Sequence, residues 1–212
     1  PEDVATALMG AGSEEERLAG ATFPSLYAIL ARAYMQEFGT TEEELAAVAV
    51  KSHFHASLNP KAQFHNLLTI EQVMRSSKIA DPLKLLDCSP ISDGAAALVI
   101  QAQKSKISGV KIVASAVATD TLGLAQRKSL TQLSAGRQAA HRAYEQAGVS
   151  AQDIHLAEVH DCFSIAEVLA MEDLGFYHRG EAARDISRGE TTLGGSKRLV
   201  VNTSGGLKGC GH

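Results

Sequence analysis

Tryptophan is absent from the 212-residue sequence, and aromatic residues make up only 5% of it. The core must therefore rest on Ala, Val, Ile and Leu side chains. No apolar run approaches the ~20 residues that a membrane-spanning helix needs, so no membrane span is expected. Lys and Arg number 20 against 24 Asp and Glu, and this net charge of -4 gives no reason to expect nucleic acid or an anionic membrane as a partner.

Cysteine is also scarce, because only Cys88, Cys162 and Cys210 are present and no two of them form a C-x-x-C pair. That number excludes a disulfide framework and fits free thiols in a reducing compartment. Three histidines, His53, His55 and His65, are too loosely spaced for a zinc site. We therefore expect no metal and place these histidines in a solvated loop.

Neither end of the sequence has the features of a natural terminus. The first residue is Pro1 rather than Met, no secretory signal follows it, and four glycines lie among residues 203–212. We expect the sequence to be a piece of a longer protein. Its first 20 residues are small and acidic, and they are expected to form a mobile linker.

The first part of the chain is predicted to be helical. Apolar residues at helical spacing predict a helix from Pro24 to Phe38, with Gly39 ending it. Thr41 and Glu44 have the spacing of a capping box and predict a second helix. Polar residues 51–63 predict a loop. A short helix over 69–76 and an extended segment over 79–83 are expected to follow.

From residue 87 onward the pattern becomes that of an α/β protein. Apolar runs predict strands, and helical periodicity predicts helices ending at Gly148 and Gly175. The predicted strands are 95–100, 110–117, 154–159 and 199–202, and the predicted helices are 133–147 and 163–174. Alternating strands and helices imply a mostly parallel sheet covered by helices, with ligands bound beyond the carboxyl ends of the strands.

Two stretches follow the last two predicted strands and carry reactive side chains. Cys162 and His160 follow strand 154–159, and His212 ends the glycine-rich stretch after strand 199–202. A helix start beside Cys162 favours its thiolate, which could act as a nucleophile or as a general base. Two imidazoles could hold an enolate or tetrahedral oxyanion. The alternatives are a packing cysteine and a solvated histidine. Asp161 is expected to cap helix 163–174, or to form a structural ion pair, and Cys210 to be a small packing residue.

Three blocks of the sequence resemble signatures of the thiolase superfamily, and they occur in family order. The blocks are Ser92–Leu98, Glu158–Phe163 and Ser204–His212. His-Asp-Cys-Phe in the second block resembles the sterol carrier protein 2 type. The resemblance implies the thiolase fold, α/β with layers αβαβα and mixed, largely parallel sheets, incomplete in this chain. It also implies a loop domain over 1–86, a last strand region of the N-terminal half over 87–107 and a truncated C-terminal half over 108–212.

The resemblance also assigns roles to residues. It implies that Cys162 moves the α-proton of acetyl-CoA, that His160 and His212 form the enolate oxyanion hole, and that Ser89 lines the pantetheine tunnel. The family's nucleophilic cysteine has no counterpart here, since Cys88 precedes Ser-Pro and lies in a different context. These residues alone are therefore expected to be inactive.

The implied reaction is acyl transfer between coenzyme A thioesters. Relatives cleave 3-ketoacyl-CoA with CoA or run the reverse Claisen condensation of acetyl-CoA, in fatty acid and lipid metabolism. Coenzyme A is a substrate, no further cofactor is expected, and the partners are acyl-CoA, CoA and further copies in a homodimer or homotetramer. An organelle is implied, either the peroxisome, glycosome or mitochondrion, although no targeting signal is visible. A non-catalytic acyl-CoA binding protein and a condensing enzyme of the same fold stay open as alternatives.

Overall fold

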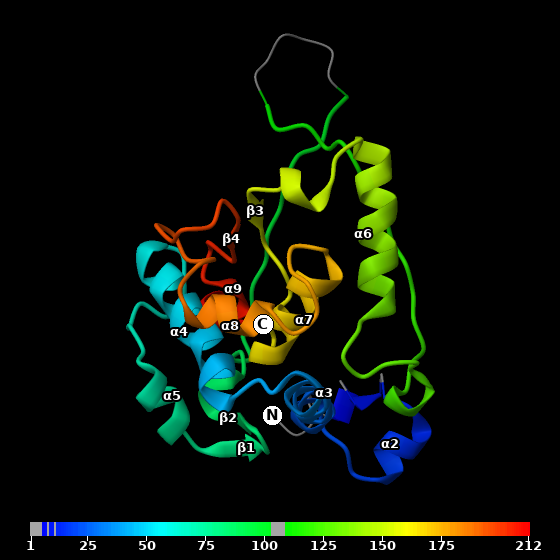
Figure 1. Ribbon diagram of the computed structural model, residues 1–212, viewed down its shortest axis with the longest axis vertical. Helices are drawn as coiled ribbons and strands as arrows, with labels where there is room; N and C mark the ends of the chain where they lie inside the picture. The colour runs from blue at the N-terminus through cyan, green and yellow to red at the C-terminus, as the bar shows by residue number, and fades with distance from the viewer. Residues whose placement is uncertain (1–5, 8, 11, 103–108) are drawn as a thin grey trace.

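The computed structural model describes residues 6–7, 9–10, 12–102 and 109–212. Helices dominate it, and the strands are short (Figure 1). The helices are α2 (Glu14–Leu18), α3 (Phe23–Phe38), α4 (Glu42–Leu58), α5 (Ile70–Arg75), α6 (Ser134–Ala147), α7 (Ser164–Asp173), α8 (Ala182–Ser187) and α9 (Gly206–Cys210). The strands are β1 (Lys78–Ala80), β2 (Leu83–Lys84), β3 (Leu156–Ala157) and β4 (Val200–Val201).

Capping residues define the ends of the longer helices as the sequence predicts. The hydroxyls of Thr22 and Thr41 accept hydrogen bonds from N3 backbone groups at the starts of α3 and α4. Gly39 and Gly148 end α3 and α6 in the left-handed conformation, with φ of 72° and 68°. The predicted helices over 24–38, 69–76, 133–147 and 163–174 are confirmed.

Helix α4 is longer than predicted, and the expected loop over 51–63 is wrong for residues 51–58. The segment is polar, but its polar side chains are buried and bonded rather than solvated. Lys51 forms an ion pair with Glu167, and His55 bonds through both ring nitrogens. Satisfied polar groups can occupy a protein interior at little net cost, so polarity alone misidentified this segment. Similarly, part of the expected linker forms α2, which Ser13 caps.

The hydrophobic core lies where α7 packs against α3, α4, α6 and α8. Helix α7 is buried on nearly every side, and Ile165, Val168 and Leu169 are fully enclosed. Tyr34 of α3 is also fully buried, and its hydroxyl donates a hydrogen bond to Glu172 of α7. Each large apolar side chain buried in this way contributes about 1.5–3 kcal/mol, so α7 is the central element of the fold.

Two small sheets are present among the described residues. Strands β3 and β4 are parallel, with Leu156 opposite Val200 and Ala157 opposite Val201. Strands β1 and β2 form an antiparallel pair. The predicted strands 154–159 and 199–202 are thus found in the expected places and pair in parallel, but each ladder covers only two residues.

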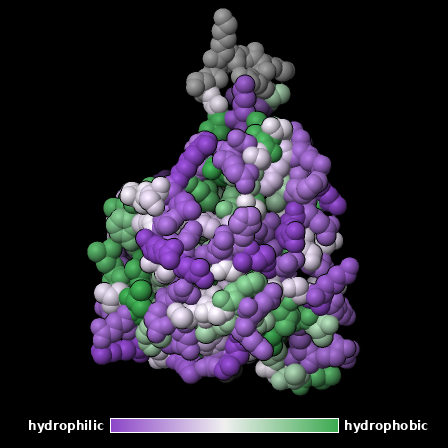
Figure 2. Space-filling view, in the orientation of Figure 1, coloured by the Kyte–Doolittle hydropathy of each residue, from purple (hydrophilic) through white to green (hydrophobic). Residues whose placement is uncertain are grey.

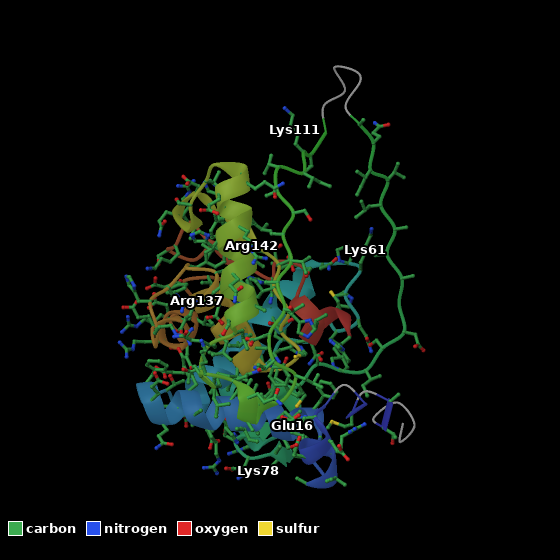
Figure 3. All side chains as sticks on the ribbon, turned by 90° about the vertical axis from the view of Figure 1, so that its right-hand side faces the viewer. Glu16, Lys61, Lys78, Lys111, Arg137 and Arg142 are labelled. Atoms are coloured by element: carbon green, nitrogen blue, oxygen red, sulfur yellow. The ribbon has the colours of Figure 1, made fainter. Side chains whose placement is uncertain are left out.

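The predicted strands 95–100 and 110–117 are wrong for this structure, because neither forms a ladder. Both are extended arms of a projection that leaves the body of the molecule (Figure 1), and Lys111 lies on one of them (Figure 3). Val99 is 93% exposed and Val110 is 102% exposed. No neighbouring strand is available to them among the described residues. Figure 2 shows a mostly hydrophilic face with apolar side chains at the base of the projection and also at the left edge and lower right of the body. The predicted polar segment 101–108 lies largely outside the described residues.

Candidate active site

The ends of β3 and β4 bring the two predicted stretches together. Since the strands are parallel, both chains leave the sheet at the same edge. His160 follows β3 and His212 follows α9, and their Nε2 atoms lie 3.3 Å apart. The two rings meet edge to face, with centroids 4.9 Å apart. The structure therefore brings the two predicted stretches together, and their shared site stays a prediction.

A buried polar network holds the ends of both strands. Asn202 is fully buried and adopts the left-handed conformation with φ of 55°. Its Oδ1 accepts the backbone N–H of Val159 at 2.7 Å, and its Nδ2 donates to Glu167 Oε2 at 2.8 Å. The other carboxylate oxygen of Glu167 pairs with Lys51 of α4. The chain therefore enters the His160 loop from a fixed point.

Asp161 joins the two loops, which corrects its predicted role. Helix α7 begins at Ser164, its N-cap residue is Phe163, and no side chain caps it, so Asp161 does not cap it. Instead Oδ1 of Asp161 accepts the backbone N–H of Leu207 at 2.7 Å, in the first turn of α9. A carboxylate is favourable at that end of a helix. Part of the stretch expected to be a glycine-rich loop is thus helical, and Gly206 lies directly against the Asp161 carboxylate.

Cys162 follows His160 by two residues in the chain and is only 6% exposed. Its carbonyl accepts the backbone N–H of Ser89 at 2.8 Å, so the structure places Ser89 beside it. The Tyr27 ring packs on Phe163 with centroids 4.6 Å apart, and the Tyr27 hydroxyl lies near enough to the Cys162 thiol to lower its pKa. Tyr27 had no signal in the sequence beyond its place within the predicted helix 24–38, so its contact with the site was missed.

Burial raises the pKa of the Cys162 thiol above its ordinary value. The Tyr27 hydroxyl, the charge of Lys208 and the Phe163 N–H at the start of α7 act in the opposite direction. The helix start therefore favours the thiolate as predicted, but it does not outweigh desolvation. Deprotonation of the Cys162 thiol therefore depends on the neighbouring groups that lower its pKa against the effect of burial.

His160 is held as a neutral imidazole near pH 7. Burial lowers the pKa of His160 first, the facing His212 lowers it further, and Asp161 opposes both. A neutral imidazole offers one N–H donor and one acceptor. The His160 ring can therefore present an N–H group to an oxygen atom without carrying positive charge.

The remaining predicted groups lie away from this pair. His53 and His55 are buried in α4, and His53 Nδ1 lies 3.1 Å from the Asn66 carbonyl, so their assignment to a solvated loop is wrong. Within the described ranges no three His, Cys, Asp or Glu side chains gather as a metal site. Cys210 was expected to be a packing residue but is exposed. None of the described helices is long and apolar enough to cross a membrane.

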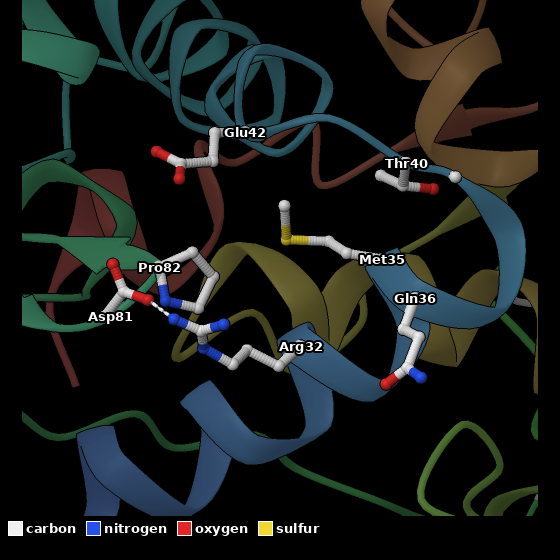
Figure 4. A pocket seen from close by; sticks show the side chains of 8 residues that line it. Arg32, Met35, Gln36, Thr40, Glu42, Asp81 and Pro82 are labelled. Atoms are coloured by element: carbon white, nitrogen blue, oxygen red, sulfur yellow. Dashed lines mark hydrogen bonds and ion pairs between the residues drawn. The ribbon is translucent and has the colours of Figure 1, made fainter.

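A pocket of about 490 Å³ lies between α3, the start of α4 and the β1–β2 turn (Figure 4). Its lining includes the ion pair between Arg32 and Asp81, with Met35 and Glu42 across from it. None of its lining residues comes from the loops that carry His160 and His212. This pocket is therefore separate from the candidate active site.

Two family models match the chain. Residues 6–104 match "Thiolase, N-terminal domain" and residues 116–212 match "Thiolase C-terminal domain-like". The chain belongs to the thiolase superfamily. An acetyl-CoA acetyltransferase of Methanothermobacter thermautotrophicus is 48% identical to this thiolase-family chain over 99% of the chain and 56% of the relative. Sterol carrier protein 2 of Bos taurus is 36% identical over 89% of the chain and 36% of the relative.

A solved structure confirms the fold of this thiolase-family chain. A chain of the Ltp2-ChsH2(DUF35) aldolase matches with a TM-score of 0.78 at 30% identity, over 88% of this chain and 51% of that chain. The predicted family, including its likeness to the sterol carrier protein 2 type, and the predicted thiolase fold are thus confirmed. The chain spans about half the length of the acetyltransferase and the aldolase chain that it matches, and about a third of sterol carrier protein 2. The domain boundaries after residues 86 and 107 stay predictions.

Proposed function

We propose that this chain carries the enolate-stabilising part of an acyl-CoA thiolase. The proposed reaction is the thiolytic cleavage of 3-ketoacyl-CoA with CoA, the reverse Claisen condensation of acetyl-CoA, or both. The observation that carries the proposal is the His160–His212 pair, with Nε2 atoms 3.3 Å apart and Cys162 two residues after His160 in the chain. Relatives named acetyl-CoA acetyltransferase support the same class of reaction.

The proposed chemical step is proton transfer beside a thioester carbonyl. In condensation, the Cys162 thiolate removes the α-proton of the acetyl group, and the electron pair of that C–H bond moves onto the carbonyl oxygen. The Nε2–H groups of His160 and His212 then hold the resulting enolate oxygen. In cleavage, the thiol returns a proton to the enolate carbon. Preorganised donors of this kind stabilise charge that develops in the transition state.

The acyl-accepting nucleophile is proposed to be a separate cysteine outside these residues. Cys88 is the described cysteine nearest to Cys162, but its thiol donates to the Lys84 carbonyl at 3.3 Å. Burial also raises the pKa of Cys88 to about 11, which keeps it protonated near neutral pH. Cys88 is therefore a poor nucleophile.

The test is Cys162→Ala in the full-length protein, with deuterium exchange at the α-carbon of acetyl-CoA as the readout. We expect exchange to fall by about 10²-fold or more, which is typical for loss of a general base. Acyl transfer to the nucleophile, followed by mass spectrometry, should survive. Exchange that stays at the wild-type rate would refute the role of Cys162. Cys210→Ala, which removes an exposed thiol, is the control and should exchange normally.

A second candidate is aldol cleavage of a 3-hydroxyacyl-CoA, and the structural match to an aldolase favours it. That reaction also forms a thioester enolate that the two histidines could hold, but it needs no acyl nucleophile. The products distinguish the two reactions, because thiolysis consumes one CoA for each carbon–carbon bond cleaved whereas aldol cleavage releases an aldehyde or ketone and consumes none. Binding of acyl-CoA without turnover would support the non-catalytic alternative.

Cellular location and assembly stay predictions. The relatives include one from Methanothermobacter thermautotrophicus and one from Bos taurus, so only some of them support a location inside an organelle. A homodimer or homotetramer is expected from family resemblance, and light scattering of the full-length protein would distinguish these states.

A further inference from the structure

Three lysine side chains are buried among the described residues, and they differ in how their charge is compensated. They are Lys51, Lys84 and Lys208, with exposures of 3%, 6% and 1%. Lys51 pairs with Glu167, and Lys84 pairs with Glu42. Lys208 forms no ion pair with any carboxylate of the described residues. A buried charge without a counter-charge is costly, so an ammonium in this position calls for a functional reason.

The ammonium of Lys208 donates to a backbone carbonyl instead, that of Asp87. The carboxylate of Asp87 is used elsewhere, because it accepts the Ser164 hydroxyl at 2.9 Å and the Lys84 backbone N–H at 3.0 Å. Both partners hold that carboxylate in place. Lys208 is therefore a buried cation whose charge is only partly compensated.

The position of this cation relates it to Cys162. The Asp87 carbonyl belongs to the peptide bond that leads into Cys88, and Cys88 forms an antiparallel bridge with Phe163. One residue further, the Ser89 N–H donates to the Cys162 carbonyl at 2.8 Å. The same short segment thus binds the Lys208 ammonium on one side and the Cys162 backbone on the other. We propose that Lys208 is a positioning residue whose charge stabilises the Cys162 thiolate.

Four ionisable groups surround the Cys162 thiol. The Tyr27 hydroxyl faces it from α3, Asp161 precedes it in the loop, Cys88 lies on the bridged segment, and Lys208 comes from α9. Among these, Lys208 is the one cation. Burial raises the pKa of Cys162, whereas the Lys208 charge lowers it, and the same charge also lowers the pKa of the neighbouring Cys88. An opposite charge near a buried acid is the usual means of restoring its anionic form.

The inference rests on the proposed function only in giving the Cys162 thiolate the role of a base. The presence of the thiolate can be measured without turnover. Iodoacetamide reacts with thiolates rather than thiols, so the pH dependence of labelling reports the thiolate fraction. Mass spectrometry of the peptide that contains Cys162 separates this site from every other cysteine in the full-length protein.

The experiment compares Lys208→Met and Lys208→Gln with wild type, each first shown to be folded by circular dichroism. We expect the midpoint of Cys162 labelling to rise by roughly one pH unit or more, the size of the effect of a nearby charge, so that labelling near neutral pH slows about tenfold. Lys208→Arg keeps the charge and should return the midpoint toward the wild-type value. Lys84→Met is the matched control, since Lys84 is also buried but paired with Glu42, and it should leave the midpoint unchanged.

An unchanged midpoint in folded Lys208→Met or Lys208→Gln overturns the inference, as does an equal rise in Lys84→Met. If neither neutral variant folds, the result for Lys208→Arg tests the inference. A folded arginine variant whose Cys162 is labelled with the midpoint of an ordinary cysteine thiol would show that the positive charge does not stabilise the thiolate. A raised midpoint combined with normal deuterium exchange in Cys162→Ala supports the electrostatic role and refutes the proposed base. The two failures are thereby distinguished.

Discussion

The side chain of Asn202 accepts a hydrogen bond from the backbone N–H of Val159 at 2.7 Å and so ties the end of β4 to the end of β3. This bond lies just before His160 on one strand and at the start of the stretch leading to His212 on the other. A single amide group thereby fixes the spacing of the two loops. The separation of the histidines depends on it as much as on the two-residue ladder between the strands.

We expect Asn202→Ala to destabilise the protein by about 2–4 kcal/mol. The change removes the bond to Val159 and the bond to Glu167, and it leaves a buried carboxylate with one partner fewer. Alanine also fits poorly at a φ of 55°. Urea denaturation of the full-length protein measures the loss. Asn202→Gly removes the strain of a positive φ but still lacks the side-chain amide. Wild-type stability in that variant would show that the hydrogen bonds of the amide do not stabilise the protein.

A matched control lies one residue away. Thr203 donates to Glu158 in an exposed bond of 2.8 Å. Thr203→Ala should therefore cost less than about 1 kcal/mol, because solvent replaces the lost partner.

His55 should make stability depend on pH. Its Nδ1 lies 2.9 Å from the Asn202 carbonyl and donates to it, and its Nε2 accepts the Leu193 N–H at 3.0 Å, so both nitrogens are used by the neutral ring. Burial lowers the pKa of His55 below its ordinary value. The unfolded chain therefore binds the proton first as pH falls. The stabilisation is complete above about pH 6.5 and is lost as pH falls through the lower folded-state value, by up to about 1.4 kcal/mol per unit.

The measurement is the cost of His55→Gln in urea unfolding at about pH 7.5 and about pH 5. We expect a cost of about 2 kcal/mol at the higher pH and a clearly smaller one at the lower pH. The measured quantity is the difference in unfolding free energy between variant and wild type, because other groups also titrate in this range. Burial raises the pKa of Asp173 to about 6, so Asp173 makes the folded protein more stable as pH falls, and it does so in both proteins. The control is His141→Gln, since His141 is exposed, and its cost should not depend on pH. An equal cost of His55→Gln at both pH values would contradict the role of His55 in the pH dependence.

The helices were predictable because their signals are local. Caps such as Thr41 and stops such as Gly148 act within one turn, and they define the start of α4 and the end of α6 without help from the rest of the chain. Strands need partners that the sequence does not name. The runs 95–100 and 110–117 have the apolar composition of buried strands, yet no described strand pairs with them and they lie exposed. Apolar composition thus predicts a tendency to be buried and does not identify what buries it.

The candidate site was predictable in outline for a similar reason. His160 and His212 follow strands, and the geometry of a parallel pair brings such residues to one edge. The groups that support them gave no signal. Lys208 stands among glycines and reads as a solvated loop residue, and its burial depends on contacts with a segment 121 positions away. Asp161 was assigned to the wrong helix because two helix starts lie near it in space and only one lies near it in sequence.

Gly206 and Gly148 provide a matched test of how closely the two loops approach. Both have positive φ, 61° and 68°, but a Cβ on Gly206 would overlap the Asp161 carboxylate whereas a Cβ on Gly148 would meet nothing within 4 Å. Gly148→Ala should cost about 1 kcal/mol through backbone conformation alone. Gly206→Ala should cost about 2–4 kcal/mol, because overlap adds to the same backbone term. Equal thermal shifts for the two variants would contradict the close approach.

The exposed projection should make the 212-residue chain associate when it is produced alone. Its two arms carry large apolar side chains at exposures that a stable surface rarely maintains over so long a stretch. These are Leu98, Val99, Ile100, Val110, Ile112, Val113 and Val117. We expect the chain to bind a hydrophobic dye strongly and to sediment as a concentration-dependent mixture. Val99→Asp with Ile112→Asp should reduce both effects, because charge opposes pairing of extended arms.

Leu18→Asp is the matched control, since Leu18 is 82% exposed but lies on α2 outside the projection. It should leave dye binding and sedimentation nearly unchanged. In the full-length protein the expected result is reversed: if the arms gain strand partners there, Val99→Asp with Ile112→Asp should cost about 3 kcal/mol or more through burial of charge, whereas Leu18→Asp should stay near neutral. Two results together would contradict this prediction. They are association of the chain that does not change when Val99 and Ile112 are replaced, and unchanged stability of the full-length variant. The arms would then be ordinary surface segments.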